Sequence, residues 1–276
     1  MRIVRNVASG IAIGIAEVIP GISGGTIAVL LNIYDELIYA VSHLKENFKQ
    51  NILFLLLVVL GSGISILAFS HVIKFLLLHY PMPVNFFFLG VVLGLVPMLS
   101  KRGTVGGFKI KYVVPFTITF LIMLGLAFIP SAQTEGASTI ITEMDPGTFF
   151  RFLCVGCLAA ICLILPGISG SMIMVIFGIY DSVIVAVSSL HIVMLIPVGL
   201  GILIGILFGA KLVDICLQKY SQLTYFAILG LVLGSTISIY NRAGFMLFSL
   251  EGLISLLTFV GGIALSIVFT ADKLQK

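Results

Sequence analysis

The chain has 276 residues, of which 60% are hydrophobic and only 9% are charged, and its mean hydropathy is +1.25. Soluble domains carry about 25% charged residues, so this chain lacks the polar surface that would coat a soluble globule. The composition therefore indicates an all-α polytopic membrane protein. The net charge of +4 is modest, and no nucleic-acid partner is expected.

The first sixteen residues, MRIVRNVASGIAIGIA, have a basic start followed by an apolar run, which is also the pattern of a signal peptide. The same pattern recurs inside the chain, because Arg5 and Gly10 correspond to Arg151 and Gly156 at one spacing of 146 residues. A segment repeated in mid-chain is part of the structure, so we expect no cleavage here.

A longer repeat follows at the same spacing. Residues 20–44, PGISGGTIAVLLNIYDELIYAVSHL, align without a gap to residues 166–190, PGISGSMIMVIFGIYDSVIVAVSSL, and 15 of the 25 positions are identical. Proline and glycine followed by Ser-Gly break a helix, and such a break inside a membrane requires protein or a polar cavity around it. We favour a re-entrant hairpin or broken helix in each copy, although two full spans joined by a loop remain possible.

Three apolar segments follow each copy, and each is near the length that crosses about 30 Å of hydrocarbon. Residues 88–96 of the first set match residues 228–236 of the second, now at a spacing of 140 residues. The segments are 51–79, 83–100, 112–129, 192–217, 223–240 and 250–270. The chain therefore divides into repeats 1–130 and 146–276 with an extracytoplasmic linker, 131–145. An odd number of spans per repeat predicts that the second repeat is inverted relative to the first.

The basic residues agree with that topology. With the N-terminus in the cytoplasm, 12 of the 15 lysines and arginines fall on or near the cytoplasmic side, as the positive-inside rule requires. The C-terminus is then cytoplasmic too. The C-x-x-C of Cys154 and Cys157 lies in an apolar run, so we interpret these cysteines as small packing residues and expect no metal or cofactor.

The repeated phrase places a helix start near Ser23 and another near Ser169. A helix N-terminus offers unpaired N–H groups and a partial positive charge, and glycine lets an anion approach the backbone. We therefore predict that two such tips, one from each repeat, form an anion site near the bilayer centre; its residues are Ser23, Gly24, Gly25, Thr26, Ser169, Gly170 and Ser171. The alternative is a simple kink at which the serine only caps the helix.

Charged residues near these tips are candidates for the same site. Arg5 and Arg151 occupy equivalent positions in apolar segments, and guanidinium groups match phosphate geometry, although interfacial snorkelling is the alternative. Glu17 has Leu163 as its counterpart and is a candidate proton carrier or a structural partner. Asp35 and Asp181, about three turns into the second helix of each hairpin, are candidate coupling residues; the alternatives are that they cap a helix, pair with an arginine or lie at the interface.

The run GIAIGIAEVIPGISGGTIAVLLNIY resembles a bacterial and archaeal membrane family, the PopT-type polyprenyl-phosphate transporters, over nearly the whole chain. The resemblance implies a flippase of the cytoplasmic membrane that returns undecaprenyl phosphate, or a related polyprenyl phosphate, from the outer to the inner leaflet during cell-wall or glycan assembly. It also implies core roles for Glu17, Ser23, Thr26 and Ser169 with the proline and glycines of the motif. This chain has Asn32 where the family usually has glycine.

Two other functions fit parts of the pattern. GISGG satisfies the G-x-S-x-G of serine hydrolases, but that motif needs a preceding strand, and none is expected here. GISG also satisfies the G-x-S-G of rhomboid-type intramembrane proteases, but these need a histidine near the serine, and all four histidines lie near predicted span ends. We therefore expect no enzyme. A channel or exchanger for a small anion also places Gly-Ser helix tips at the membrane centre, and it remains the main alternative. The oligomeric state does not follow from the sequence.

Overall fold

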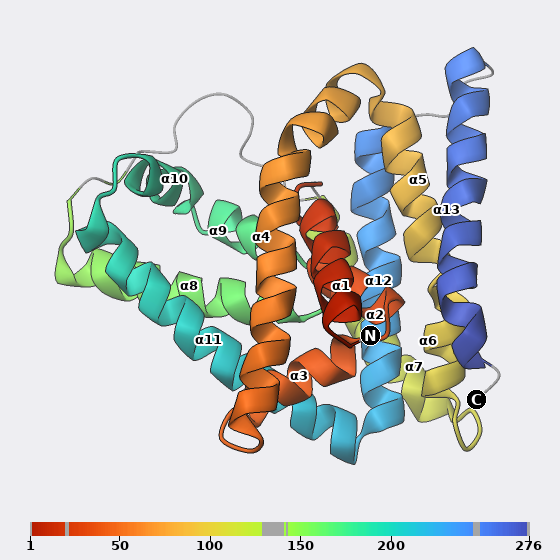
Figure 1. The fold of residues 1–276 in the computed structure, drawn as a ribbon, viewed down its shortest axis with the longest axis horizontal. Coiled ribbons are helices and arrows are strands. Elements are labelled where there is room, and N and C mark those ends of the chain that lie inside the picture. The colour runs from red at the N-terminus through yellow and green to blue at the C-terminus, as the bar shows by residue number, and fades with distance from the viewer. Residues whose placement is uncertain (1, 20–21, 129–140, 142, 245–248, 275–276) are drawn as a thin grey trace.

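The structure, a computed structural model, describes residues 2–19, 22–128, 141, 143–244 and 249–274. Within these residues all regular structure is helical (Figure 1). The elements in chain order are α1 (Arg2–Glu17), α2 (Gly24–Leu30), α3 (Tyr34–Ser42), α4 (Phe48–His79), α5 (Pro81–Leu93), α6 (Val96–Gly103), a 3-10 turn η1 (Ile110–Tyr112), α7 (Val113–Ala127), α8 (Pro146–Ile164), α9 (Gly170–Ile176), α10 (Tyr180–Ser188), α11 (Ile192–Lys219), α12 (Ser221–Ala243) and α13 (Leu250–Leu274).

Seven helical segments among the described residues are long and apolar enough to cross a membrane. Six of them correspond to the six predicted spans, with α5 and α6 forming one segment, and the seventh is α8. Two pairs of short helices are bent sharply, by 117° between α2 and α3 and by 112° between α9 and α10. The prediction of an all-α polytopic membrane protein is confirmed. The expected helix breaks lie between α1 and α2 and between α8 and α9, whereas the sharp bends within the two short pairs come further along the chain.

The element bounds repeat along the chain. Helices α2 and α3 have the same lengths as α9 and α10 and start 146 residues before them. The segment Pro81–Gly103 and helix α12 each have 23 residues and start 140 residues apart. The inversion of the second copy and the domain boundaries stay predictions, and most of the linker 131–145 lies outside the described residues.

Long helices pack in pairs through glycines. Helix α1 packs on α4 and α8 packs on α11, while α5 packs on α13 and α7 on α12. A Cβ at Gly61 of α4 would overlap the carbonyl of Val7, and one at Gly201 of α11 would overlap that of Leu153. These backbones approach so closely because glycine has no side chain, as is usual between helices in lipid.

The start of α8 is held by Asp145, whose carboxylate accepts a hydrogen bond from the Thr148 amide at 2.5 Å. That bond lowers the pKa of Asp145, because it stabilises the charged form of an exposed side chain.

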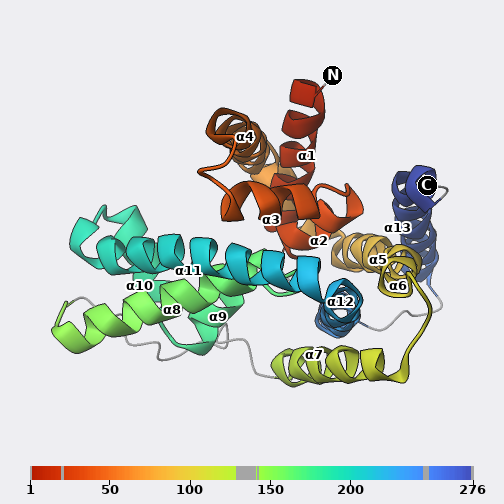
Figure 2. The ribbon, with the colours of Figure 1, turned by 90° about the horizontal axis from the view of Figure 1, so that it is seen from below.

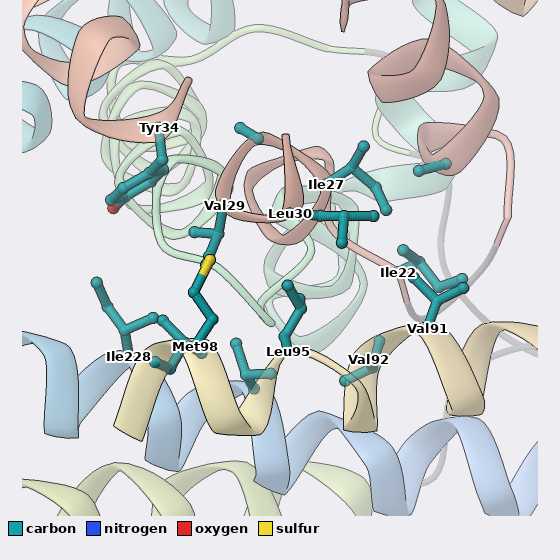
Figure 3. Close-up of a cluster of buried hydrophobic side chains, with 14 of the residues drawn as sticks. Ile22, Ile27, Val29, Leu30, Tyr34, Val91, Val92, Leu95, Met98 and Ile228 are labelled. Atoms are coloured by element: carbon teal, nitrogen blue, oxygen red, sulfur yellow. The ribbon is translucent and has the colours of Figure 1, made fainter. Parts of the chain in front are cut away.

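Helix α2 lies at the centre of the molecule. Figure 3 shows its apolar side chains, among them Ile27, Val29 and Leu30, in one cluster with Leu95, which lies between α5 and α6, and with Met98 of α6. All five of these side chains are buried. Burial on this scale fixes α2 in position, so the helix start at Gly24 and the bend after Leu30 are held in place relative to the surrounding helices.

Candidate functional site

The N-terminus of α2 is capped by residues of its own repeat. Ser23 is the N-cap, and its Oγ accepts the Gly25 amide at 3.2 Å. The carboxylate of Glu17 accepts the Gly24 amide at 2.8 Å, and the Thr26 amide bonds to the Ser23 carbonyl at 2.9 Å. Each of these three amides therefore has a partner within the chain, and the Ser23 hydroxyl accepts one of them.

The N-terminus of α9 is different. Ser169 is again the N-cap, but it makes no side-chain capping bond, and its Oγ lies 2.8 Å from Ser171 Oγ. Leu163 stands where the first copy has Glu17, so no carboxylate reaches the Gly170 amide. Among the described residues, no group accepts a hydrogen bond from the amides of Gly170 and Ser171. This tip therefore keeps the donors that a helix start offers to an anion.

The two repeated motifs lie side by side. A Cβ built on Gly25 would lie 3.3 Å from the Ile164 carbonyl oxygen and 3.4 Å from Pro166 Cα. Helix α2 thus starts against the segment that leads into α9, and the joining of the two tips into one anion site stays a prediction. Pro20 and Gly21 of the first motif lie outside the described residues.

The two arginines bond beside the bends of the short pairs rather than to the serines. Arg5 forms an ion pair with Glu36 in the first turn of α3, with 2.7 Å between Nη2 and Oε2. Arg151 donates from Nη2 to the Phe177 carbonyl, at the C-terminal end of α9, at 2.6 Å. Each arginine thus ties the first helix of its repeat to the bent pair, and their predicted role in binding substrate stays a prediction.

The expectation that each hairpin has one continuous second helix is wrong. Helix α2 ends at Leu30, and Asn32 has a left-handed backbone with φ of 56°. The equivalent Gly178 has φ of 64°. Glycine is the usual residue in this conformation and asparagine is the best-tolerated substitute, which explains Asn32 at this position. Asp35 and Asp181 therefore lie in the first turns of α3 and α10 rather than three turns into a helix.

A group of polar side chains, here named the bend cluster, surrounds the first bend; its members are Asn32, Asp35, Arg102 and Tyr225. Arg102, near the end of α6, donates to Asp35 Oδ2 at 2.9 Å and to the Tyr225 hydroxyl at 2.7 Å, and it also bonds to Asn32 Oδ1. The Tyr225 hydroxyl in turn bonds to Asp35 at 2.9 Å. The bend cluster thus joins α3 and α6 of the first repeat to α12 of the second.

Arg102 and Tyr225 were missing from the predicted site. One signal was available in the sequence, because Arg102 and Arg242 fall at the same place in the segments Pro81–Gly103 and Ser221–Ala243. Arginine so near the end of a span, in both copies, indicates a role shared by the repeats.

The described residues around Ser23 do not show the arrangement of a hydrolase. Ser23 Oγ accepts an amide N–H, and no histidine bonds to it among the described residues. No strand precedes Ser23 within residues 2–19 and 22. Residues 2–19, 22–128, 141, 143–244 and 249–274 contain no group of three or more histidine, cysteine or acidic side chains that would hold a metal ion.

Paired helix breaks inside a bundle of apolar helices define a class of polytopic transport proteins. The chain belongs to the undecaprenyl phosphate translocase-like family, whose model matches residues 13–251. It is 27% identical over 243 residues to a polyprenyl-phosphate transporter of Staphylococcus aureus, covering 85% of each chain. It is 28% identical over 240 residues to a polyprenyl-phosphate transporter of Vibrio cholerae, covering 82% of this chain and 74% of the relative. No solved structure matches it. The family consists of transporters, not enzymes.

Proposed function

We propose that this protein transports polyprenyl phosphate across the cytoplasmic membrane, returning undecaprenyl phosphate or a related lipid from the outer to the inner leaflet. Family membership and the names of two relatives support the substrate class. The observation that carries the proposal is the open N-terminus of α9, with Ser169 and Ser171, beside the motif of the first repeat. The direction of transport, from the outer to the inner leaflet, is also part of the proposal.

The lipid chemistry suits this arrangement. A phosphate alone in hydrocarbon is costly, since a charged group at the bilayer centre costs about 2.5 kcal/mol or more. Backbone amides at a helix start and two serine hydroxyls offset that cost by replacing the water around the phosphate. The polyprenyl tail stays in lipid, so only the headgroup needs a polar path.

Glu17 is the proposed coupling group. Its carboxylate bonds to the Gly24 amide, which is one of the donors a phosphate would use. Protonation of Glu17 removes its negative charge and weakens that bond, so phosphate competes better for the α2 tip. A proton gradient would then favour binding in one direction. Asp35 and Asp181 are the other proposed coupling residues, and Arg5 and Arg151 hold the bent pairs that carry the two tips.

The alternative is a channel or exchanger for a small anion, because the same tips would bind phosphate or chloride without a lipid tail. The test is flux of labelled polyprenyl phosphate between the leaflets of proteoliposomes, with and without a proton gradient, beside flux of inorganic phosphate and chloride. The proposal expects lipid flux that depends on the protein and no flux of the free anions. Free-anion flux without lipid flux would overturn it in favour of the channel.

A further inference from the structure

Two of the four members of the bend cluster, Asp35 and Arg102, have equivalents in the other repeat, whereas Asn32 and Tyr225 correspond to Gly178 and Asn85. Arg102 is the second-to-last residue of the segment Pro81–Gly103, and Arg242 is the second-to-last residue of α12, a segment of the same length. Asp35 and Asp181 are both the second residue of their helices, α3 and α10. The residues equivalent to the ion pair of Arg102 and Asp35 are therefore Arg242 and Asp181.

That second pair is not formed here. Both side chains belong to exposed residues, and neither has a hydrogen bond or an ion pair with any described residue. Arg102, by contrast, has three partners from two repeats. The same sequence pattern is thus used at one bend and left unused at the other.

The packing of the short helices shows the same asymmetry. Helix α3 lies across α11 of the other repeat, and the His43 Nδ1 to Asp214 Oδ2 distance there is 3.5 Å (Figure 2). No comparable packing joins the equivalent helices α10 and α4 among the described residues. Figure 1 shows α10 at the far end of α11, away from α12. One bent pair is therefore attached to the opposite repeat and the other is not.

A protein built from two inverted copies can exchange their conformations, because each copy can adopt the arrangement seen in the other. We infer that Arg242 and Asp181 pair in a second conformation, in which the pair of Arg102 and Asp35 is broken. This inference rests on the proposed transport function and its inverted repeats. The two arginines then act as alternating positioning residues, one for each end of the transport path.

The exchange suits a reversible step. Forming the pair of Arg242 and Asp181 offsets part of the cost of breaking the bonds of Arg102, so a substrate headgroup or a proton can shift the populations of the two conformations. By the charge distribution Arg102 lies on the cytoplasmic side and Arg242 on the outer side. On this predicted topology, the pair of Arg102 and Asp35 holds the cytoplasmic end in the conformation described here, and the exchange would release that end while the outer pair forms.

Cross-linking in membrane vesicles tests this inference without measuring transport. In a background with alanine at the four cysteine positions, Asp181→Cys and Arg242→Cys are joined with a short bifunctional maleimide. Asp35→Cys with Arg102→Cys gives the yield of a pair in contact. Adding Asp35→Asn to the variant with cysteines at positions 181 and 242 removes the ion pair of Arg102 and Asp35. We expect the yield of the cross-link between positions 181 and 242 to rise about fivefold, the change produced by losing about 1 kcal/mol of pairing.

Glu36→Gln is the matched control, because Glu36 follows Asp35 directly but pairs with Arg5 of its own repeat. It should leave the yield unchanged. An equal rise with Glu36→Gln, or no rise with Asp35→Asn, would overturn the exchange, as would the absence of any cross-link between positions 181 and 242. If the yields change as expected while vesicles show no lipid flux, the proposed substrate is wrong and the exchange stands.

Discussion

The bent pairs α2–α3 and α9–α10 have equal lengths and bends of 117° and 112°, yet they are held very differently. The first pair is capped by Glu17 and Ser23 and is tied at its bend to Arg102 and Tyr225. The second pair has an N-terminus without a side-chain cap, and among the described residues Arg151 bonds to the Phe177 carbonyl alone. Two copies of one motif thus differ in the polar groups around them, and we propose that the copy without a cap is the one that takes a ligand.

The largest expected effect tests the part in which the two halves agree, the close packing of their long helices. Gly61→Ala and Gly201→Ala each place a methyl group on a backbone carbonyl of the neighbouring helix, and we expect each to cost about 1–3 kcal/mol of stability. Thermal unfolding in detergent measures this.

The control glycines lie two residues away in the same helices. A Cβ at Gly63 or Gly199 meets nothing within 4 Å, so Gly63→Ala and Gly199→Ala should leave the unfolding temperature unchanged or slightly higher. Equal losses for all four variants would show that general helix chemistry, not close approach, explains the effect.

The spans and helix breaks were predictable because they depend on local composition, on runs of apolar residues and on Pro-Gly-x-Ser-Gly. The bend between α2 and α3 was missed because a single left-handed residue, Asn32, interrupts an otherwise apolar run. The contact of Arg102 with Tyr225 was missed because the two residues are 123 positions apart, and only the folded packing joins them. The capping bond from Gly24 to Glu17 also depends on the geometry of the break.

The next effect concerns Glu17, the clearest chemical difference between the two tips. Glu17→Gln keeps an oxygen that accepts the Gly24 amide but removes the charge and the titration. We expect lipid flux to lose its dependence on the proton gradient, while flux at neutral pH without a gradient changes about tenfold or less, as for loss of one charged hydrogen bond. A variant with the wild-type response to the gradient would exclude Glu17 as the coupling group.

Serine substitutions separate capping from binding. Ser23→Ala removes the acceptor for the Gly25 amide and should cost about 1 kcal/mol of stability. Ser169→Ala removes no capping bond, so it should leave the unfolding temperature unchanged and weaken lipid flux instead. The reverse pattern, a stability loss only for Ser169→Ala, would show that the two caps have been assigned the wrong roles.

The smallest expected effect is at the start of α8. The pKa of Asp145 is lowered by its bond to the Thr148 amide, so its stabilisation is present at neutral pH and is lost as the pH falls through the folded-state pKa. Asp145→Asn should unfold at a slightly lower temperature than the wild type at pH 7. This difference in unfolding temperature, here called the gap, should disappear in acid. A gap that persists in acid would contradict a charge-dependent cap.

The central claim is that the open start of α9 holds the headgroup because it lacks the carboxylate that closes the start of α2. Leu163→Glu supplies that carboxylate, since Leu163 Cβ lies 3.4 Å from a Cβ position on Gly170. Leu163→Met is the control for a changed side chain without charge. Flux of labelled polyprenyl phosphate should fall at least about tenfold in Leu163→Glu proteoliposomes, as for loss of about 1.4 kcal/mol of binding, and stay near wild type in Leu163→Met. Normal flux in well-folded Leu163→Glu would contradict the account.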